Sequence, residues 1–122
     1  MIARMPLGVV GAILPGNAPA MVGSWKLGSA LVSGNAVNLK PAEDALLVLM
    51  RIVELALEAG FPEGVVQVVT GDGAVGAALA RHMDVDCIAF RGSGEVGRSI
   101  LEASARSNLK RPGWSLAARA PI

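Results

Sequence analysis

Aromatic residues and cysteine are scarce in this sequence of 122 residues, and neither sign of charge dominates. Aromatic side chains make up 3% of the chain and tyrosine is absent, which leaves little to stack on nucleic-acid bases. The net charge of +1 gives no broad positive field, so we expect no nucleic-acid partner. The single cysteine, Cys87, cannot form an internal disulfide and fits a reducing compartment, so we expect a cytoplasmic protein.

Charge is also absent from the run between Met5 and Trp25, which raises secretion and membrane insertion as alternatives. Ala18-Pro19-Ala20 is similar to a signal cleavage site. However, Pro15, Asn17 and Pro19 interrupt the run near its centre, where they would break a membrane helix and place polar groups in lipid. We therefore interpret the run as a strand, a loop and the start of a helix, and we expect no membrane partner.

The sequence does contain a regular alternation of apolar runs of strand length and stretches of helical periodicity. Hydrophobic residues make up 52% of the chain, enough for one domain with a sizeable core. The expected strands cover residues 6–14, 36–40, 65–70 and 86–90, and the expected helices cover residues 17–33, 44–59, 74–82 and 94–107. This order predicts an α/β fold, a Rossmann-like parallel sheet with helices on both faces.

Two charged residues follow one another where the second expected strand ends. Lys40 closes that strand, and Glu43 lies one turn into the helical region that follows. At the carboxyl edge of a parallel sheet, a lysine suits a hydroxyl or phosphate oxygen and a carboxylate suits ribose hydroxyls. The alternative is a solvated strand end followed by a capping residue, which the spacing alone favours.

Glycine-rich turns precede the last two expected helices. Gly92-Ser93 stands directly before a helix, so its backbone N–H groups and hydroxyl could receive a pyrophosphate or ribose oxygen. An N-cap role for Ser93 is an equal alternative. The segment 71–76 matches the G-x-G-x-x-G pattern, but it follows the third expected strand rather than the first. It is therefore weak evidence for the usual dinucleotide fold.

Three further polar residues have a functional and a structural interpretation. Asn17 lies just past the first expected strand, where its amide could donate to a developing oxyanion or could cap the helix, and the residues alone favour the cap. His82 ends a helix, where it complements the helix dipole at the surface. Cys87 lies in an apolar strand, so we interpret it as a small hydrophobic residue rather than a nucleophile. No metal site is expected.

Taken together, several segments resemble the coenzyme-binding domain of aldehyde dehydrogenases. The resemblance runs from residue 6 to about residue 111, through PLGVVGAILPGN, WKLGSALVSGN, VNLKPAE, EAGFPEGVVQVVTG, MDVDCIAFRGS and SNLKR. It implies NAD as coenzyme, with NADP possible, and oxidation of an aldehyde to a carboxylic acid through a cysteine thioester. WKLG and VVTG are similar to the branch that oxidises aminoaldehydes such as gamma-glutamyl-aminobutyraldehyde. The implied partners are a small-molecule aldehyde and further copies of the parent in a homo-oligomer.

The resemblance also implies roles for individual residues. Asn17 matches the asparagine whose amide stabilises the oxyanion, so the family pattern overturns the capping interpretation. Glu43 is compatible with NAD. The coenzyme contacts fall on Ile13, Leu14 and Pro15 beside the nicotinamide ribose, Lys40 and Glu43 at the adenosine ribose, Gly73 and Gly76 at the adenine, and Phe90, Gly92, Ser93 and Val96 around the pyrophosphate.

The sequence departs from the family pattern inside the site and at its end. Gly16, Ala18 and Arg91 replace the usual tryptophan, phenylalanine and threonine, and Arg91 would either pair with phosphate or obstruct the ribose. Residues 112–122 read PGWSLAARAPI, whereas a one-base shift of the reading frame near Arg111 would restore Trp-Leu-Glu and Gly-Gly-Lys-Ser-Pro-Asn.

We therefore interpret residues 1–111 as a partial NAD(P)-binding domain and residues 112–122 as an atypical, frameshifted tail. Such a chain would supply coenzyme binding without the catalytic cysteine and the general-base glutamate, so it should not oxidise an aldehyde by itself. The alternative is a non-catalytic nucleotide-binding or assembly module.

Overall fold

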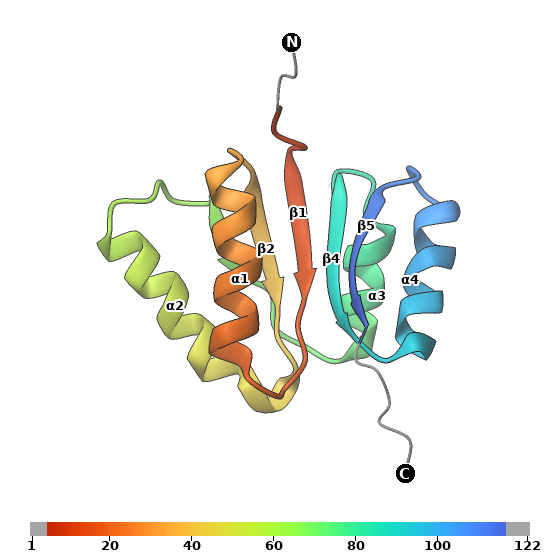
Figure 1. Ribbon diagram of the computed structural model, residues 1–122, viewed down its shortest axis with the longest axis horizontal. Helices are drawn as coiled ribbons and strands as arrows, with labels where there is room; N and C mark the ends of the chain where they lie inside the picture. Colours follow the sequence, from red (N-terminus) through yellow and green to blue (C-terminus); the bar gives the residue numbers. More distant parts are fainter. Residues whose placement is uncertain (1–4, 117–122) are drawn as a thin grey trace.

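Parallel strands form a single five-stranded sheet in the computed structural model, which describes residues 5–116 (Figure 1). The strand order is β3-β2-β1-β4-β5. The strands are β1 (Val9–Ile13), β2 (Ala36–Lys40), β3 (Val66–Val68), β4 (Cys87–Gly92) and β5 (Arg111–Leu116). The helices are α1 (Pro19–Val32), the 3-10 helix η1 (Glu43–Ala45), α2 (Leu46–Glu58), α3 (Gly73–Arg81) and α4 (Gly94–Ala105). The predicted α/β fold is confirmed.

Helices pack on both faces of the sheet because its strands are apolar on both sides. Val10 and Ala12 of β1 belong to a core cluster with residues of α1 and α2, whereas Ile13 packs on the cluster built by α3, α4 and β4. Figure 1 shows α1 in front of β2, and α3 behind β4 and β5. Neighbouring residues of β1 therefore serve two separate cores.

Helix ends follow the turn signals in the sequence. Gly34 has a φ of 79°, and the N–H groups of Gly34 and Asn35 bond to the carbonyl oxygens of Leu31 and Ala30 at 2.9 and 3.1 Å. This is the Schellman arrangement, which needs a residue that tolerates the left-handed region. The stop predicted at Gly34-Asn35 is therefore confirmed.

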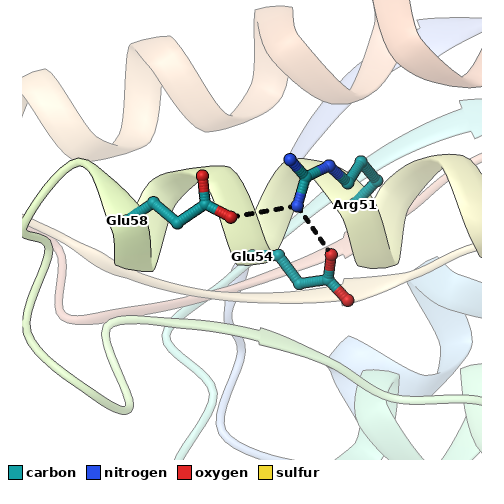
Figure 2. A network of polar contacts seen from close by, with 3 residues as sticks. All are labelled: Arg51, Glu54 and Glu58. Carbon is teal, nitrogen blue, oxygen red and sulfur yellow. Dashed lines mark hydrogen bonds and ion pairs between the residues drawn. The ribbon is translucent and has the colours of Figure 1, made fainter.

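The outer side of α2 carries a small ionic network (Figure 2). The Arg51 Nη1 atom lies 3.0 Å from Glu54 Oε2 and 3.0 Å from Glu58 Oε1. All three side chains are more than half exposed, so screening by water leaves the pairs with little effect on stability. They keep this side of the helix polar.

Several predicted boundaries were wrong. The first helix begins at Pro19, so Asn17 and Ala18 lie in the preceding loop. The second helical region starts as the 3-10 turn η1 before α2 begins. β4 runs through Gly92, so Arg91 and Gly92 belong to a strand and not to a loop.

A fifth strand was not predicted. β5 pairs in parallel with β4, from Cys87 opposite Arg111 to Gly92 opposite Leu116, and it crosses the boundary placed after residue 111. Residues 117–122 of the predicted tail lie outside the described residues. In the part of the chain that the structure describes, no helix combines the length and apolarity needed to span a bilayer.

Candidate functional site

The carboxyl edge of the sheet has a point where the strand order reverses. β1 pairs with β2 on one side and β4 on the other, and Ile13 lies opposite both Lys40 and Phe90. The Leu14 N–H continues the ladder by donating to the Lys40 carbonyl at 3.0 Å. In open α/β sheets a crevice at such a point is the usual place for a ligand. Three residues predicted to bind the coenzyme thus share one level of adjacent strands.

A groove of about 140 Å³ lies between α3 and α4, next to β1. We call it the α3–α4 groove. Four of the predicted coenzyme residues line it, namely Ile13, Gly73, Gly76 and Val96. A Cβ atom at Gly76 would lie 3.9 Å from Ile13 Cδ1 and 4.0 Å from Lys40 Cδ. These are ordinary contact distances, so the absence of a side chain at Gly76 leaves space in the groove beside Ile13 and Lys40.

Sequence reasoning missed the other residues of this groove. They are Ala77, Ala80, Arg81, Ser99, Ile100 and Ala103. Small residues recur every three or four positions along the facing sides of α3 and α4, which is the spacing of one helix face. This spacing of small residues could have predicted that the two helices face one another across a groove.

Lys40 and Glu43 lie at the same edge. Lys40 is 6% exposed, and within residues 5–116 its ammonium group forms no hydrogen bond or ion pair. Glu43 is the first residue of η1 and is exposed. The Lys40 Nζ is not among the fully buried, unpartnered polar atoms of the described residues, so the ammonium can be reached by a ligand oxygen at this edge.

Ser93 and Gly92 follow the next strand at this edge. The Ser93 hydroxyl accepts a hydrogen bond from the Val96 N–H at 3.4 Å, so it caps α4, the alternative given for it from sequence. A Cβ at Gly92 would lie 2.6 Å from Phe90 Cζ, so the buried Phe90 ring covers this glycine. None of these three residues lines the α3–α4 groove, although Val96, which follows in α4, does.

Leu14 and Pro15 are arranged differently from the other predicted contacts. The Leu14 side chain is 3% exposed and packs in the α1 and α2 core, so a ligand could reach only its backbone. Pro15 is half-buried in the loop before α1. This loop is close to η1, since a Cβ at Gly16 would lie 2.5 Å from Asp44 Oδ1.

Asn17 is exposed in the same loop and does not cap α1. The N-cap position belongs to Ala18, whose φ of 53° and ψ of 49° are left-handed, and no side chain caps the helix there. The capping interpretation of Asn17 is therefore wrong. Its amide stays available to a ligand at the carboxyl edge of β1.

Other polar residues lie away from the α3–α4 groove. Arg91 alternates with the buried Phe90 along β4, which places it on the face that carries Cys87 and α1. Cys87 is half-buried at the amino end of β4. His82 is the exposed C-cap residue of α3, and its Nδ1 accepts a hydrogen bond from the Asp84 N–H at 3.2 Å.

Comparisons with known proteins point in one direction. The chain matches the aldehyde dehydrogenase family over residues 1–122. It is 48% identical over 118 residues to an aldehyde dehydrogenase of Agaricus bisporus, covering 96% of this chain and 24% of the relative. It is 51% identical over 112 residues to the NADP/NAD-dependent aldehyde dehydrogenase PuuC of Escherichia coli, covering 91% of this chain and 23% of the relative.

Solved structures also match the chain. PnpE from Pseudomonas sp. WBC-3, which has also been solved with nicotinamide adenine dinucleotide, matches with a TM-score of 0.87 and 54% identity over 93% of this chain and 23% of its own. Gamma-glutamyl-gamma-aminobutyraldehyde dehydrogenase from Burkholderia cenocepacia matches with a TM-score of 0.87 and 52% identity, over 88% of this chain and 22% of its own. The chain thus spans about a quarter of the length of the relatives it matches. It belongs to the aldehyde dehydrogenase family.

Proposed function

We propose that this chain is the coenzyme-binding part of an NAD-dependent aldehyde dehydrogenase. The observation that carries the proposal is the α3–α4 groove, where Ile13, Gly73, Gly76 and Val96 meet next to Lys40. The NAD complex of PnpE, a structure with the same fold at 54% identity, supports the choice of ligand.

The residues present fit NAD. The small side chains of the α3–α4 groove leave room for a flat heterocycle between two helices. The Lys40 ammonium and the Glu43 carboxylate complement the hydroxyl groups of the adenosine ribose. Because a 2′-phosphate would place its negative charge beside Glu43, the same carboxylate disfavours NADP.

In the whole enzyme, NAD would accept the hydride that leaves the substrate carbon. The exposed Asn17 amide, in the loop after β1, would donate a hydrogen bond to the oxygen on which negative charge develops. Cys87 is not placed for attack, because it lies at the amino end of β4 and the site lies at the carboxyl end. We assign the cysteine that forms the thioester, and the general-base glutamate, to parts of the protein outside this chain.

Three finer assignments belong to this proposal. An aminoaldehyde substrate is supported by the 52% identity to gamma-glutamyl-gamma-aminobutyraldehyde dehydrogenase. The 54% identity to PnpE is similar, so sequence identity does not distinguish the aminoaldehyde branch from the rest of the family. The cytosolic aldehyde dehydrogenase 1 of Mus musculus, 48% identical over 119 residues, supports a cytoplasmic location. A homo-oligomeric parent follows from the family resemblance alone.

The most direct test introduces a larger side chain into the α3–α4 groove. Calorimetric titration of the 122-residue chain with NAD should give saturable binding, and Gly76→Val should weaken it at least about tenfold, because the valine would occupy the seam between α3 and Ile13. Gly28→Val is the matched control, since nothing lies within 4 Å of a Cβ at Gly28. Absence of NAD binding by a folded chain, or equal binding by the Gly76 variant, would contradict the proposal.

The tail has a test of its own. We propose that a one-base shift near Arg111 produced residues 112–122, and reading the genomic DNA in three frames checks it. If no shift restores the glutamate segment, the tail is genuine. A soluble chain that binds NAD with its tail in frame would then favour the non-catalytic nucleotide-binding module.

A further inference from the structure

Lys110 is a buried cation just before β5, at the edge of the sheet opposite to the coenzyme residues. It is 4% exposed, and its Nζ donates to the Ala80 carbonyl and to the Ser107 hydroxyl, each at 2.9 Å. Ala80 lies in the last turn of α3, and Ser107 directly follows the end of α4. One side chain therefore connects the C-terminal ends of the two helices that line the α3–α4 groove.

The Ser107 hydroxyl carries this connection into α4. Its Oγ donates to the Ala103 carbonyl at 2.7 Å. Ala80 and Ala103 are each among the last four residues of their helix, whose carbonyl groups have no N–H partner within the helix. Both residues also line the α3–α4 groove. This path of hydrogen bonds, which we call the helix brace, thus joins the two walls of the groove.

Other hydrogen bonds fix the turn from which the Lys110 side chain extends. The Asn108 Nδ2 atom donates to the Met83 and Val85 carbonyls at 2.7 and 2.9 Å. The buried Ser104 hydroxyl donates to the Lys110 carbonyl at 2.7 Å. These bonds hold the turn against α4 and against the loop before β4, and none of them reaches α3. The contact with α3 is made by the Lys110 ammonium.

Burial of this ammonium needs an explanation beyond stability. Burial lowers the pKa of Lys110, and the charge of Asp86 raises it. The carbonyl ends of α3 and α4 carry partial negative charge, so both helices favour a cation at this point. Methionine, an apolar side chain of similar length, would fill the space without desolvating a charge, and such exchanges are often neutral for stability. A methionine would not, however, hydrogen-bond to both helices.

We propose that Lys110 is a positioning residue for the coenzyme, because the helix brace fixes the spacing of α3 and α4 and hence the width of the groove between them. Small side chains predominate along both walls, so they interlock little and do not set the spacing by themselves. Gly76 and Val96 lie on the same two helices, so a change of spacing at the brace also moves these residues. The role in coenzyme binding rests on the proposed function, whereas the fixed spacing does not.

Electron–electron double resonance between two spin labels measures the spacing directly. The labels are attached through Ala78→Cys on α3 and Glu102→Cys on α4, both exposed positions, in a chain that also carries Cys87→Ala. Lys110→Met should broaden the distance distribution or shift its mean by about 2 Å. Ser104→Ala should leave the distribution unchanged, because it removes a buried hydrogen bond of the same turn without touching α3. An unchanged distribution in Lys110→Met overturns the proposal.

Calorimetric titration with NAD tests the consequence for the coenzyme. Lys110→Met and Ser107→Ala should each weaken binding about three- to tenfold, since each breaks the helix brace. Ser107→Thr keeps the hydroxyl and should bind as the wild type does. Ser104→Ala is the matched control and should leave the affinity unchanged. Equal weakening in Ser104→Ala, or wild-type affinity in both brace variants, overturns the proposal.

The two measurements separate this proposal from the proposed function. If the folded wild-type chain does not bind NAD, the coenzyme role falls with the proposed function, and the spin-label distances still decide whether the brace sets the spacing. Circular dichroism confirms that each variant is folded. If Lys110→Met does not fold, Ser107→Ala replaces it in both measurements, because that variant removes the hydroxyl contact and leaves the ammonium bonded to Ala80.

Discussion

At the scale of single residues, Asn35 does more than end α1. Its Oδ1 accepts the Leu7 and Gly8 N–H groups at 2.6 and 3.0 Å, and its Nδ2 donates to the Ala30 carbonyl at 3.0 Å. Asn35 is 6% exposed, and its bonds are buried to Ala30 and part-buried to Leu7 and Gly8, so Asn35→Ala should lower the free energy of unfolding by about 1–3 kcal/mol. Urea denaturation measures this. Asn38 of β2 makes no side-chain hydrogen bond within the described residues. Asn38→Ala should therefore lower the free energy of unfolding clearly less than Asn35→Ala.

Ala18 holds the Asn17 loop in a strained conformation. Its φ of 53° is left-handed, and the following Pro19 restricts it further. Ala18→Gly should therefore raise the free energy of unfolding by about 0.5–1 kcal/mol, even though glycine gains entropy in the unfolded chain. Ala20→Gly, inside α1, should have the opposite effect and cost about 0.5–1 kcal/mol. Equal signs for the two variants would contradict the assignment of strain, and thermal unfolding compares them.

The sequence predicted site residues that belong to a local motif better than residues whose role depends on tertiary contacts. Gly73 and Gly76 both line the groove, and the family motif contains both glycines. Leu14 shows the limit of a motif, because adjacent residues of a strand point to opposite faces and Ile13 already faces the groove. Two of the three side-chain hydrogen bonds of Asn35 depend on tertiary contacts with residues 7 and 8, which no local pattern contains.

At the scale of secondary structure, α3 forms one wall of the coenzyme groove and its start depends on a cap. Asp72 Oδ1 accepts the Ala74 N–H at 2.9 Å, whereas the Ser93 cap of α4 is longer, at 3.4 Å. Asp72→Ala should cost about 1 kcal/mol in urea unfolding, and Asp72→Asn should restore most of it. Hydrogen exchange at Ala74 and Val75 should accelerate in the alanine variant. A larger loss for Ser93→Ala than for Asp72→Ala would contradict this ranking.

Most helices and strands were predicted from the periodicity of apolar residues, but β5 was not. Pro112 lacks an N–H and Gly113 has no side chain to pack, so a segment containing both resembles a loop. β5 is an edge strand, paired with β4 alone, and an edge tolerates both residues. The end of β4 was misplaced for a related reason, since Gly92 is typical of a turn but here packs under the Phe90 ring.

At the scale of the whole molecule, each face of the sheet is covered by two helices over part of its width. α1 and α2 pack over β1 to β3, and α3 and α4 pack beside β1, β4 and β5. The α3–α4 groove lies on one face, and a groove of about 640 Å³ beside α1 lies on the other. A coenzyme in the α3–α4 groove would therefore approach the carboxyl edge from the side of α3 and α4, where Ile13 of β1 lies opposite Lys40 and Phe90.

The outer side of α1 and α2 leaves large apolar side chains in water. Val32 is 91% exposed and Leu47 is 79% exposed, and Trp25 of α1 is 59% exposed. Since apolar surface of this kind drives association, the 122-residue chain should self-associate as its concentration rises, as measured by sedimentation velocity. Replacing Val32 and Leu47 together with lysine should shift the chain toward monomer and change the free energy of unfolding by less than about 1 kcal/mol. Leu49→Lys, at a position that is 0% exposed, should instead unfold the chain. A wild-type chain that stays monomeric at high concentration would show that these side chains do not drive association.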